Sequence, residues 1–158
     1  MKVMLVNGSS HLHGTTMTAL EEMIKVFYSE EVETEVVQLG GKPIADCLQC
    51  NVCQKTGKCV IKDDGVNEFV EKAKTADGFV FATPVYWWGM SAQLKQVIDK
   101  CYCRGMQLKG KKAGVIVAGG SPVDNIQYEL IRKQFECMAG YLSWDMLFQK
   151  SYYATDRD

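Results

Sequence analysis

The sequence predicts an α/β fold in which five parallel strands form a doubly wound sheet, with helices on both faces in three α/β/α layers. Two observations carry this prediction. Compact apolar runs alternate along the chain with longer segments whose apolar residues recur at helical spacing. Such alternation implies parallel βαβ units. Because the 158 residues contain no repeat and no low-complexity linker, we expect a single domain over residues 1–158.

The first predicted strand is a compact apolar run that ends in a turn residue, Gly8, and the helix that follows it has an apolar stripe. In the first helix the stripe is formed by Met17, Leu20, Met23, Ile24 and Phe27. The predicted strands are residues 2–8, 34–39, 77–85, 111–120 and 143–153. The predicted helices are residues 15–30, 64–76, 91–103 and 124–141.

A cysteine-rich insertion loop at about residues 40–64 separates the second strand from the second helix. It holds Cys47, Cys50, Cys53 and Cys59 in the spacing C-x2-C-x2-C-x5-C. The chain has seven cysteines, and a cytoplasmic chain of this length needs no disulfides, so the spacing favours metal or redox chemistry. Successive x2 steps favour a 4Fe–4S cluster over zinc, although thiols without a cluster stay open. The other three cysteines lie in predicted helices and are interpreted as packing residues: Cys101, Cys103 and Cys137.

Three loops should meet at the carboxyl ends of the strands, where ligands bind in this architecture. Residues 9–16 are rich in hydroxyls and open a helix, which suits a phosphate, although a simple helix cap explains them equally well. In residues 84–91, three successive aromatics could wall a flat ring or pack on a partner subunit. Gly119 and Gly120 allow close approach of a ligand to the backbone.

The stretches "GSSHLHGTT", "TPVYWWGMSAQLKQVIDK" and "AGG" resemble the NADPH-dependent FMN reductases of the flavodoxin-like superfamily. "CLQCNVCQKTGKCVIKDD" is similar to the motif of the iron–sulfur flavoproteins, which carry a 4Fe–4S cluster near FMN. The resemblance implies a flavodoxin-like fold, bound FMN and a cluster held by the four cysteines of the loop. The implied phosphate site is Ser9, His11, Gly14, Thr15 and Thr16, and the implied ring site is Thr83, Pro84, Val85, Tyr86, Trp87, Gly89 and Met90, bordered by Gly119 and Gly120.

Two positions depart from the family pattern. His11 stands where members often have arginine, and Thr15 stands where they often have asparagine. We therefore expect FMN to bind more weakly as pH rises and His11 loses its proton. The chain also ends at Asp158 without the last helix usual in this fold, so we expect a homodimer or homotetramer that covers the sheet face.

The composition narrows the partners. A net charge of −1 gives no basic excess for nucleic acid or an anionic membrane surface. No apolar run is long enough to span a bilayer and the N-terminus lacks a signal peptide, so we expect a cytoplasmic protein.

These expectations combine into one function. The chain is interpreted as an FMN-dependent NAD(P)H oxidoreductase that relays single electrons through the cluster. NAD(P)H or a redox carrier protein would be the donor, and a small molecule the acceptor. The alternatives are an electron carrier without substrate turnover and a zinc- or thiol-bearing binding module.

Overall fold

A computed structural model describes residues 1–154, with every side chain in that range except that of Cys103. The interpretation of Cys103 as a packing residue therefore lies outside the described residues. Five strands form one sheet in the order β2-β1-β3-β4-β5, and every neighbouring pair is parallel, which confirms the predicted fold class. The strands are β1 Lys2–Asn7, β2 Glu33–Gln38, β3 Gly78–Pro84, β4 Lys112–Gly119 and β5 Asp145–Tyr153.

The strand order places the centre of the sheet where the winding direction changes. The chain passes from β1 outward to β2, then returns past β1 to β3 and continues to β5. Strands β1, β3 and β4 are buried almost throughout, because both sheet faces are covered there, and their sequences are correspondingly continuous apolar runs. The carboxyl ends of β1 and β3 therefore flank the switch point at which ligands bind in doubly wound sheets.

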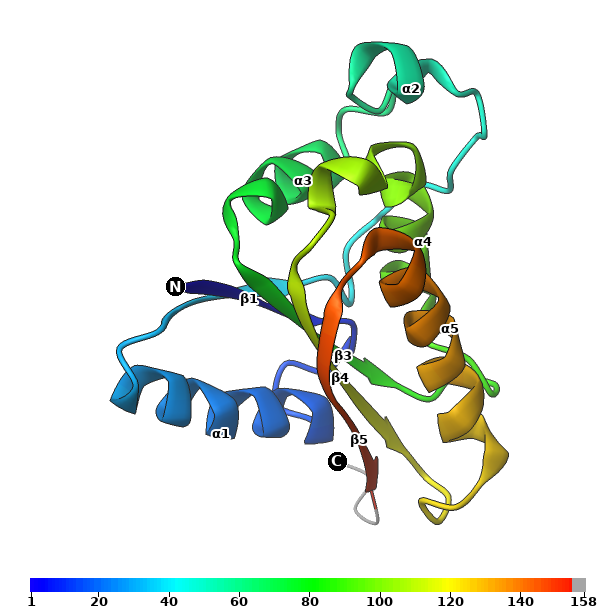
Figure 1. Ribbon diagram of the computed structural model, residues 1–158. Coiled ribbons are helices and arrows are strands. Elements are labelled where there is room, and N and C mark those ends of the chain that lie inside the picture. Colours follow the sequence, from blue (N-terminus) through cyan, green and yellow to red (C-terminus); the bar gives the residue numbers. More distant parts are fainter. Residues whose placement is uncertain (155–158) are drawn as a thin grey trace.

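Helices cover the two faces unequally (Figure 1). Helix α1 lies on one face, where Leu20 packs into a core with Leu5 and Val80. On the other face α3, α4 and α5 contribute Phe69, Leu94 and Phe135 to a larger core. No helix within residues 1–154 is long and apolar enough to cross a membrane. The helices are α1 Thr15–Ser29, α2 Val52–Thr56, α3 Val66–Thr75, α4 Ala92–Cys101, the 3₁₀ helix η1 Tyr102–Leu108, and α5 Ile126–Leu142.

Two short elements were not predicted. Helix α2 lies inside the cysteine-rich loop, and it projects away from the sheet beyond the end of α4 (Figure 1). The other is η1, into which the third predicted helix, α4, continues, and Gly105 of η1 lies against the end of α5. A Cβ at Gly105 would lie 3.1 Å from Leu142 Cδ2, so the glycine permits this close approach.

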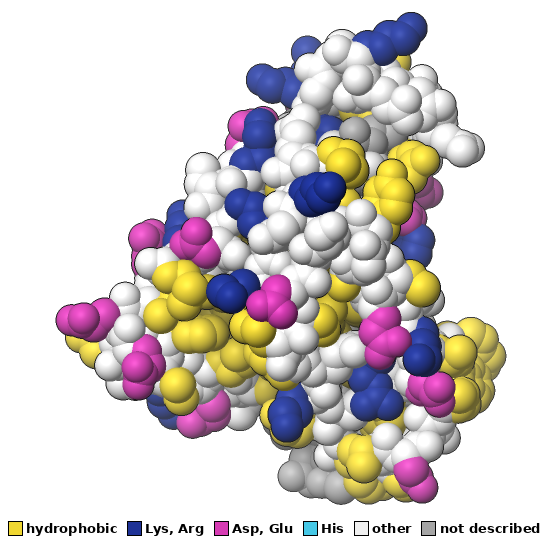
Figure 2. All heavy atoms as spheres, viewed as in Figure 1, with side chains coloured by type: hydrophobic (Ala, Val, Ile, Leu, Met, Phe, Trp, Pro, Cys, Tyr) yellow, Lys and Arg dark blue, Asp and Glu magenta, His cyan; other side chains and the backbone are white. Residues whose placement is uncertain are grey.

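Charged side chains of both signs are mixed over the face shown in Figure 2, in keeping with the net charge of −1. Lysines gather at the end of the molecule that α2 forms, where Lys55 and Lys58 are exposed. The cysteine-rich loop therefore carries its positive charges on the outside.

Candidate functional site

The loop between β1 and α1 is held in place by polar contacts that sequence reasoning missed. The buried side chain of Asn7 accepts the Ser9 N–H through Oδ1 at 3.1 Å. Gln38 donates through Nε2 to the carbonyl oxygen of Ser9 at 2.6 Å, and Ser9 Oγ accepts the His11 N–H at 3.1 Å. A Cβ at Gly40 would lie 1.8 Å from the Ser9 carbonyl oxygen, so only glycine fits beside this loop. Because these partners come from β1, β2 and the segment after β2, the loop has a fixed shape.

This fixed loop leaves the N-terminus of α1 available to an anion. Gly14 is the N-cap residue, no side chain described within residues 1–154 caps the helix, and the first turn has no acidic residue. Thr16 is 3 % exposed, and its Oγ1 is buried without a hydrogen-bond partner. Buried polar atoms are nearly always paired, and a helix N-terminus attracts a negative charge. The orphaned Thr16 hydroxyl and the uncapped helix therefore fit a terminal phosphate.

His11 lies next to this helix end. A Cβ built on Gly14 would lie 3.2 Å from His11 Cβ and 3.8 Å from its Nδ1, so the imidazole stands beside the N-cap. His11 and Thr15 are exposed. Both side chains are therefore accessible to a ligand that binds at this helix end.

The loop between β3 and α4 is a tight turn that exposes two tryptophans. Tyr86 and Gly89 exchange two backbone hydrogen bonds, at 2.9 and 3.0 Å. Between them, Trp87 and Trp88 have φ angles of 48° and 62°, in the left-handed region that bulky residues seldom adopt. Trp87 is 91 % exposed. Backbone strain of this kind gathers at ligand clamps, so the turn fits a wall for a flat ring.

Hydrogen bonds anchor this turn to its flanking elements. Thr83 Oγ1 accepts the Ser91 N–H at 3.0 Å, and Ser91 Oγ caps α4 by accepting the Leu94 N–H at 3.4 Å. The Tyr86 hydroxyl lies 3.4 Å from Ser10 Oγ of the first loop. The two loops that flank the switch point are therefore neighbours, as the sequence predicts.

The end of β4 borders the candidate site on a third side, beside the two loops described above. A Cβ at Gly119 would lie within 3.0 Å of the side chains of Val85, Gln127 and Tyr128, so the strand end requires glycine. Gln127 is 8 % exposed, and its Nε2 is buried without a partner. It is a second unpaired polar group among the described residues at these loops, and no sequence motif predicts it because its position depends on the packing of α5.

Not every predicted residue faces the solvent at these loops. Met90 is buried in the core and lines a hollow between α4 and α5. Pro84 and Val85 are half-buried, and Gly120 is exposed. The assignment of individual residues to the phosphate and ring sites stays a prediction.

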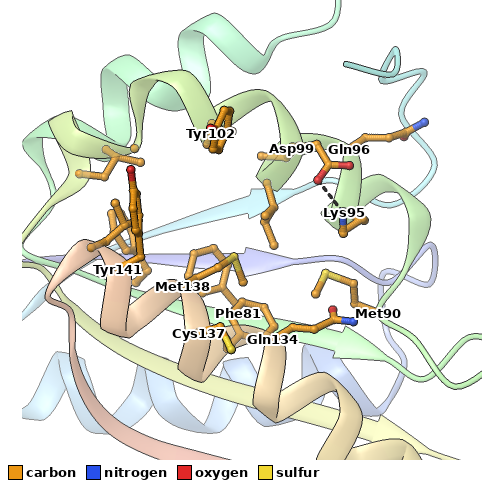
Figure 3. A pocket seen from close by; sticks show the side chains of 18 of the residues that line it. Phe81, Met90, Lys95, Gln96, Asp99, Tyr102, Gln134, Cys137, Met138 and Tyr141 are labelled. Atoms are coloured by element: carbon orange, nitrogen blue, oxygen red, sulfur yellow. Dashed lines mark hydrogen bonds and ion pairs between the residues drawn. The ribbon is translucent and has the colours of Figure 1, made fainter. Parts of the chain in front are cut away.

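The hollow between α4 and α5 is about 1010 Å³ in volume (Figure 3). Its floor is apolar and includes Phe81, while Met138 and Tyr141 line it from α5. Lys95 and Asp99 of α4 form an ion pair at 2.5 Å on its α4 side. It reaches from Met90, beside the β3–α4 loop, to Cys47 in the cysteine-rich loop.

The four cysteines of the loop line one small hollow of about 30 Å³. Left-handed backbone at Gln49, Asn51 and Gly57 turns the chain around it, and Gly57 forms the turn expected there. Turns of this kind occur around phosphate and iron–sulfur sites, since they direct backbone N–H groups inward. Among the described side chains, no three of His, Cys, Asp or Glu are grouped closely enough to hold a metal ion. The donor set and the backbone fit a cluster, but the thiols must draw together to bind one.

A buried ion pair borders this hollow. Lys100 of α4 is 3 % exposed and pairs with Asp64, which also accepts the Val66 N–H at the start of α3. Burial lowers the pKa of Lys100, while negative charge on Cys59 and Cys47 acts to raise it. Thiolates in the hollow would therefore favour the charged ammonium.

Cys101 behaves as a packing residue. It packs on the larger core, and burial raises the pKa of its thiol to about 12. The thiol therefore stays protonated at neutral pH and is a poor metal ligand.

Comparison with known proteins connects these loops to a family. Residues 1–143 match the family described as NADPH-dependent FMN reductase. An iron–sulfur flavoprotein from Methanocaldococcus jannaschii is 39 % identical over 123 residues, which are 77 % of this chain and 63 % of the relative. The chain thus spans less than two thirds of the length of this relative.

Solved structures share the fold at low sequence identity. An NAD(P)H:quinone oxidoreductase from Methanothermobacter marburgensis superposes with a TM-score of 0.77 and 16 % identity, over 100 % of this chain and 89 % of the other. An FMN-dependent NADH-azoreductase from Bacillus anthracis, solved in complex with FMN, gives 0.71 and 14 %, over 100 % and 90 %. These likenesses confirm the predicted flavodoxin-like fold of this chain.

Proposed function

Because the chain belongs to the NADPH-dependent FMN reductase family, we propose that it is an FMN-dependent NAD(P)H oxidoreductase. The observation that carries this proposal is the orphaned Thr16 hydroxyl at the uncapped N-terminus of α1. Bound FMN would supply the redox chemistry by accepting a hydride from NAD(P)H and releasing electrons singly or in pairs. The protein supplies binding, orientation and the potential of the flavin.

We assign binding of the phosphate to the first loop and binding of the ring to the second. Thr16 and the free N–H groups of α1 would hold the phosphate, with His11 beside them. The strained turn at Trp87 and Trp88 would flank the ring, and the exposed Gly120, with open space beside it, would let the ring approach the end of β4. No side chain is needed as an acid or base for hydride transfer, so the site only has to position the ring and exclude competing reactions.

The finer part of the proposal is a 4Fe–4S cluster held by the four cysteines of the loop. All four line one hollow, and the Methanocaldococcus relative is named an iron–sulfur flavoprotein. A cluster passes electrons one at a time. It would therefore restrict either the delivery of electrons to FMN or their release from FMN to single-electron steps. Such a site needs reduced thiols, and we keep the cytoplasm as the expected compartment for that reason.

Anaerobic purification and reconstitution test this proposal. We expect a yellow protein that contains FMN, with about four irons and four sulfides per chain. Replacing Cys53 with Ser should remove iron and sulfide together while FMN stays bound, because Cys53 is remote from the FMN loops. Stoichiometric zinc, or no iron after reconstitution, would reject the cluster and leave an FMN reductase with a thiol-rich loop.

Turnover distinguishes an enzyme from an electron carrier. NADPH consumption with a quinone or free flavin as acceptor supports the reductase, and flavin that NADPH does not reduce supports a carrier served by another redox protein. A protein without bound flavin would favour the zinc- or thiol-bearing module.

We also propose that the protein is a homodimer or homotetramer. The support is the amount of apolar surface that one copy leaves uncovered, including Trp87, Tyr141 and the apolar hollow between α4 and α5. Monomers seldom expose large apolar patches, and two-fold assemblies are the commonest way to cover them.

A further inference from the structure

The cysteine hollow lies beside a buried positive charge that the proposed oxidoreductase activity does not explain. Arg104 of η1 is 1 % exposed, and its Nε is buried without a hydrogen-bond partner. Among the described residues, no carboxylate lies within ion-pair distance of its guanidinium. A buried guanidinium without a counter-charge is costly, because arginine remains charged in a protein.

The side chain of Asn67 connects Arg104 to Cys59. Its Nη1 donates to Asn67 Oδ1 at 2.9 Å, and its Nη2 donates to the Lys100 carbonyl oxygen at 3.2 Å. The same Asn67 Oδ1 accepts the Cys59 N–H at 2.9 Å, while Asn67 Nδ2 donates to the Cys59 carbonyl oxygen at 3.1 Å. Asn67 therefore grips both backbone groups of Cys59, and Arg104 orients Asn67.

The other end of the cysteine-rich loop is tied to the same elements. Asp64 Oδ2 accepts the Ala45 N–H at 3.2 Å, two residues before Cys47, and it pairs with Lys100. Lys100 and Asp64 neutralise each other. Among these buried charges, the positive charge of Arg104 therefore has no counter-charge. Asn67 connects it to Cys59.

A cluster would supply the missing negative charge. Four thiolates leave a 4Fe–4S centre net negative, and each reduction adds one further electron. A fixed positive charge nearby favours the reduced form, since net charge and hydrogen bonds around the sulfurs set the reduction potential.

We infer that Arg104 is a positioning residue for the cysteine centre, which fixes Cys59 through Asn67 and raises the reduction potential of the cluster by compensating its charge. The inference rests on the proposed 4Fe–4S site. It assigns to η1, the element that the sequence did not predict, a role in tuning electron transfer.

The test is an EPR-monitored redox titration of the reconstituted full chain. Arg104→Met keeps most of the apolar stem without the charge, and Arg104→Gln keeps a donor for Asn67 without the charge. We expect each to lower the equilibrium constant for one-electron reduction of the cluster at least tenfold, which is about 59 mV for such a couple. Arg104→Lys should stay within about threefold of the unmodified protein, because it retains the charge, although without the bidentate fork.

Arg132→Met is the matched control, since Arg132 is a partly exposed arginine on α5 and its charge is screened by solvent. It should leave the potential unchanged. Circular dichroism and FMN content show that each variant is folded. Folded neutral variants that lose iron and sulfide while Arg104→Lys retains them would also support the inference.

Three results overturn it. A neutral variant that holds a full cluster at the reduction potential of the unmodified protein would show that the charge has no role. An Arg104→Lys variant that behaves like Arg104→Met would show the same. An unmodified protein that assembles no cluster overturns the proposed 4Fe–4S site itself, and this inference with it, so the two failures are distinguishable.

Discussion

Replacing Thr16 with Val tests the phosphate site with two effects of opposite sign. The substitution removes a hydroxyl that is buried and unpaired, and it keeps the β-branched shape. A hydrogen bond to a charged group contributes about 1.5–3 kcal/mol. If Oγ1 donates to the FMN phosphate, its loss should weaken FMN binding roughly 10- to 150-fold.

The protein without FMN should respond in the other direction. A buried hydroxyl without a partner costs about 1–3 kcal/mol, so its removal should raise the free energy of unfolding by about 1 kcal/mol. For a chain of this length that is a rise in Tm of roughly 2–4 °C. Fluorescence titration with FMN and thermal unfolding of the flavin-free protein measure the two effects.

Thr18→Val is the matched control. Thr18 lies on the same helix, but it is exposed and its Oγ1 donates to the Gly14 carbonyl oxygen at 3.3 Å. Surface changes of this kind usually stay within about 0.5 kcal/mol. An unchanged dissociation constant in Thr16→Val, or a lower Tm of its flavin-free form, would show that the hydroxyl does not face the phosphate and would refute the reasoning.

Four further predictions test other parts of the molecule. His11→Arg should tighten FMN binding, because it places a permanent positive charge beside the N-cap of α1; an unchanged dissociation constant would contradict the position of residue 11 beside the phosphate. Gly40→Ala should destabilise the protein by more than about 1 kcal/mol, because its Cβ would collide with the Ser9 backbone. Gly140→Ala should stabilise it by about 0.5–1 kcal/mol, because Gly140 lies within α5 and has open space beside it. Chemical denaturation measures both effects, and equal effects would contradict the close contact between Gly40 and Ser9. Sedimentation at micromolar concentration should show a dimer or tetramer rather than a 17.7 kDa species. Mass spectrometry of the extracted flavin should identify FMN, and FAD would contradict a site that ends in a phosphate.

Local patterns predicted the parallel sheet because the three central strands, β1, β3 and β4, are continuous apolar runs. The same reasoning missed α2 and η1, since five- and seven-residue elements carry too little periodicity to be recognised. The loops with the candidate site were also predicted, because Thr16, Trp87 and Gly119 follow strand ends in the sequence.

What the sequence did not reveal depends on distant packing. Asn7 and Gln38 fix the first loop only because β1 and β2 are neighbours, and Gln127 is aimed by the docking of α5. The left-handed turn at Trp87 could not be predicted, since tryptophan disfavours that conformation; two backbone hydrogen bonds between Tyr86 and Gly89 close the turn around it. Nothing local distinguishes the polar residues Asn7, Gln38 and Gln127, because they are neither apolar nor part of a recognised motif.

Helix α4 relates the two proposed redox centres to each other. Its N-cap, Ser91, is anchored to Thr83 in the strand end at the ring site, and Lys100 near its other end borders the cysteine hollow. Nine residues separate them, which is roughly 14 Å at the rise of an α-helix. The hollow between α4 and α5 extends along the same helix from Met90 to Cys47, so the space between the centres is largely apolar. One helix would thus set the distance between the proposed FMN site and the proposed cluster, and a movement of the cysteine-rich loop alone would alter the cysteine centre without disturbing the FMN loops.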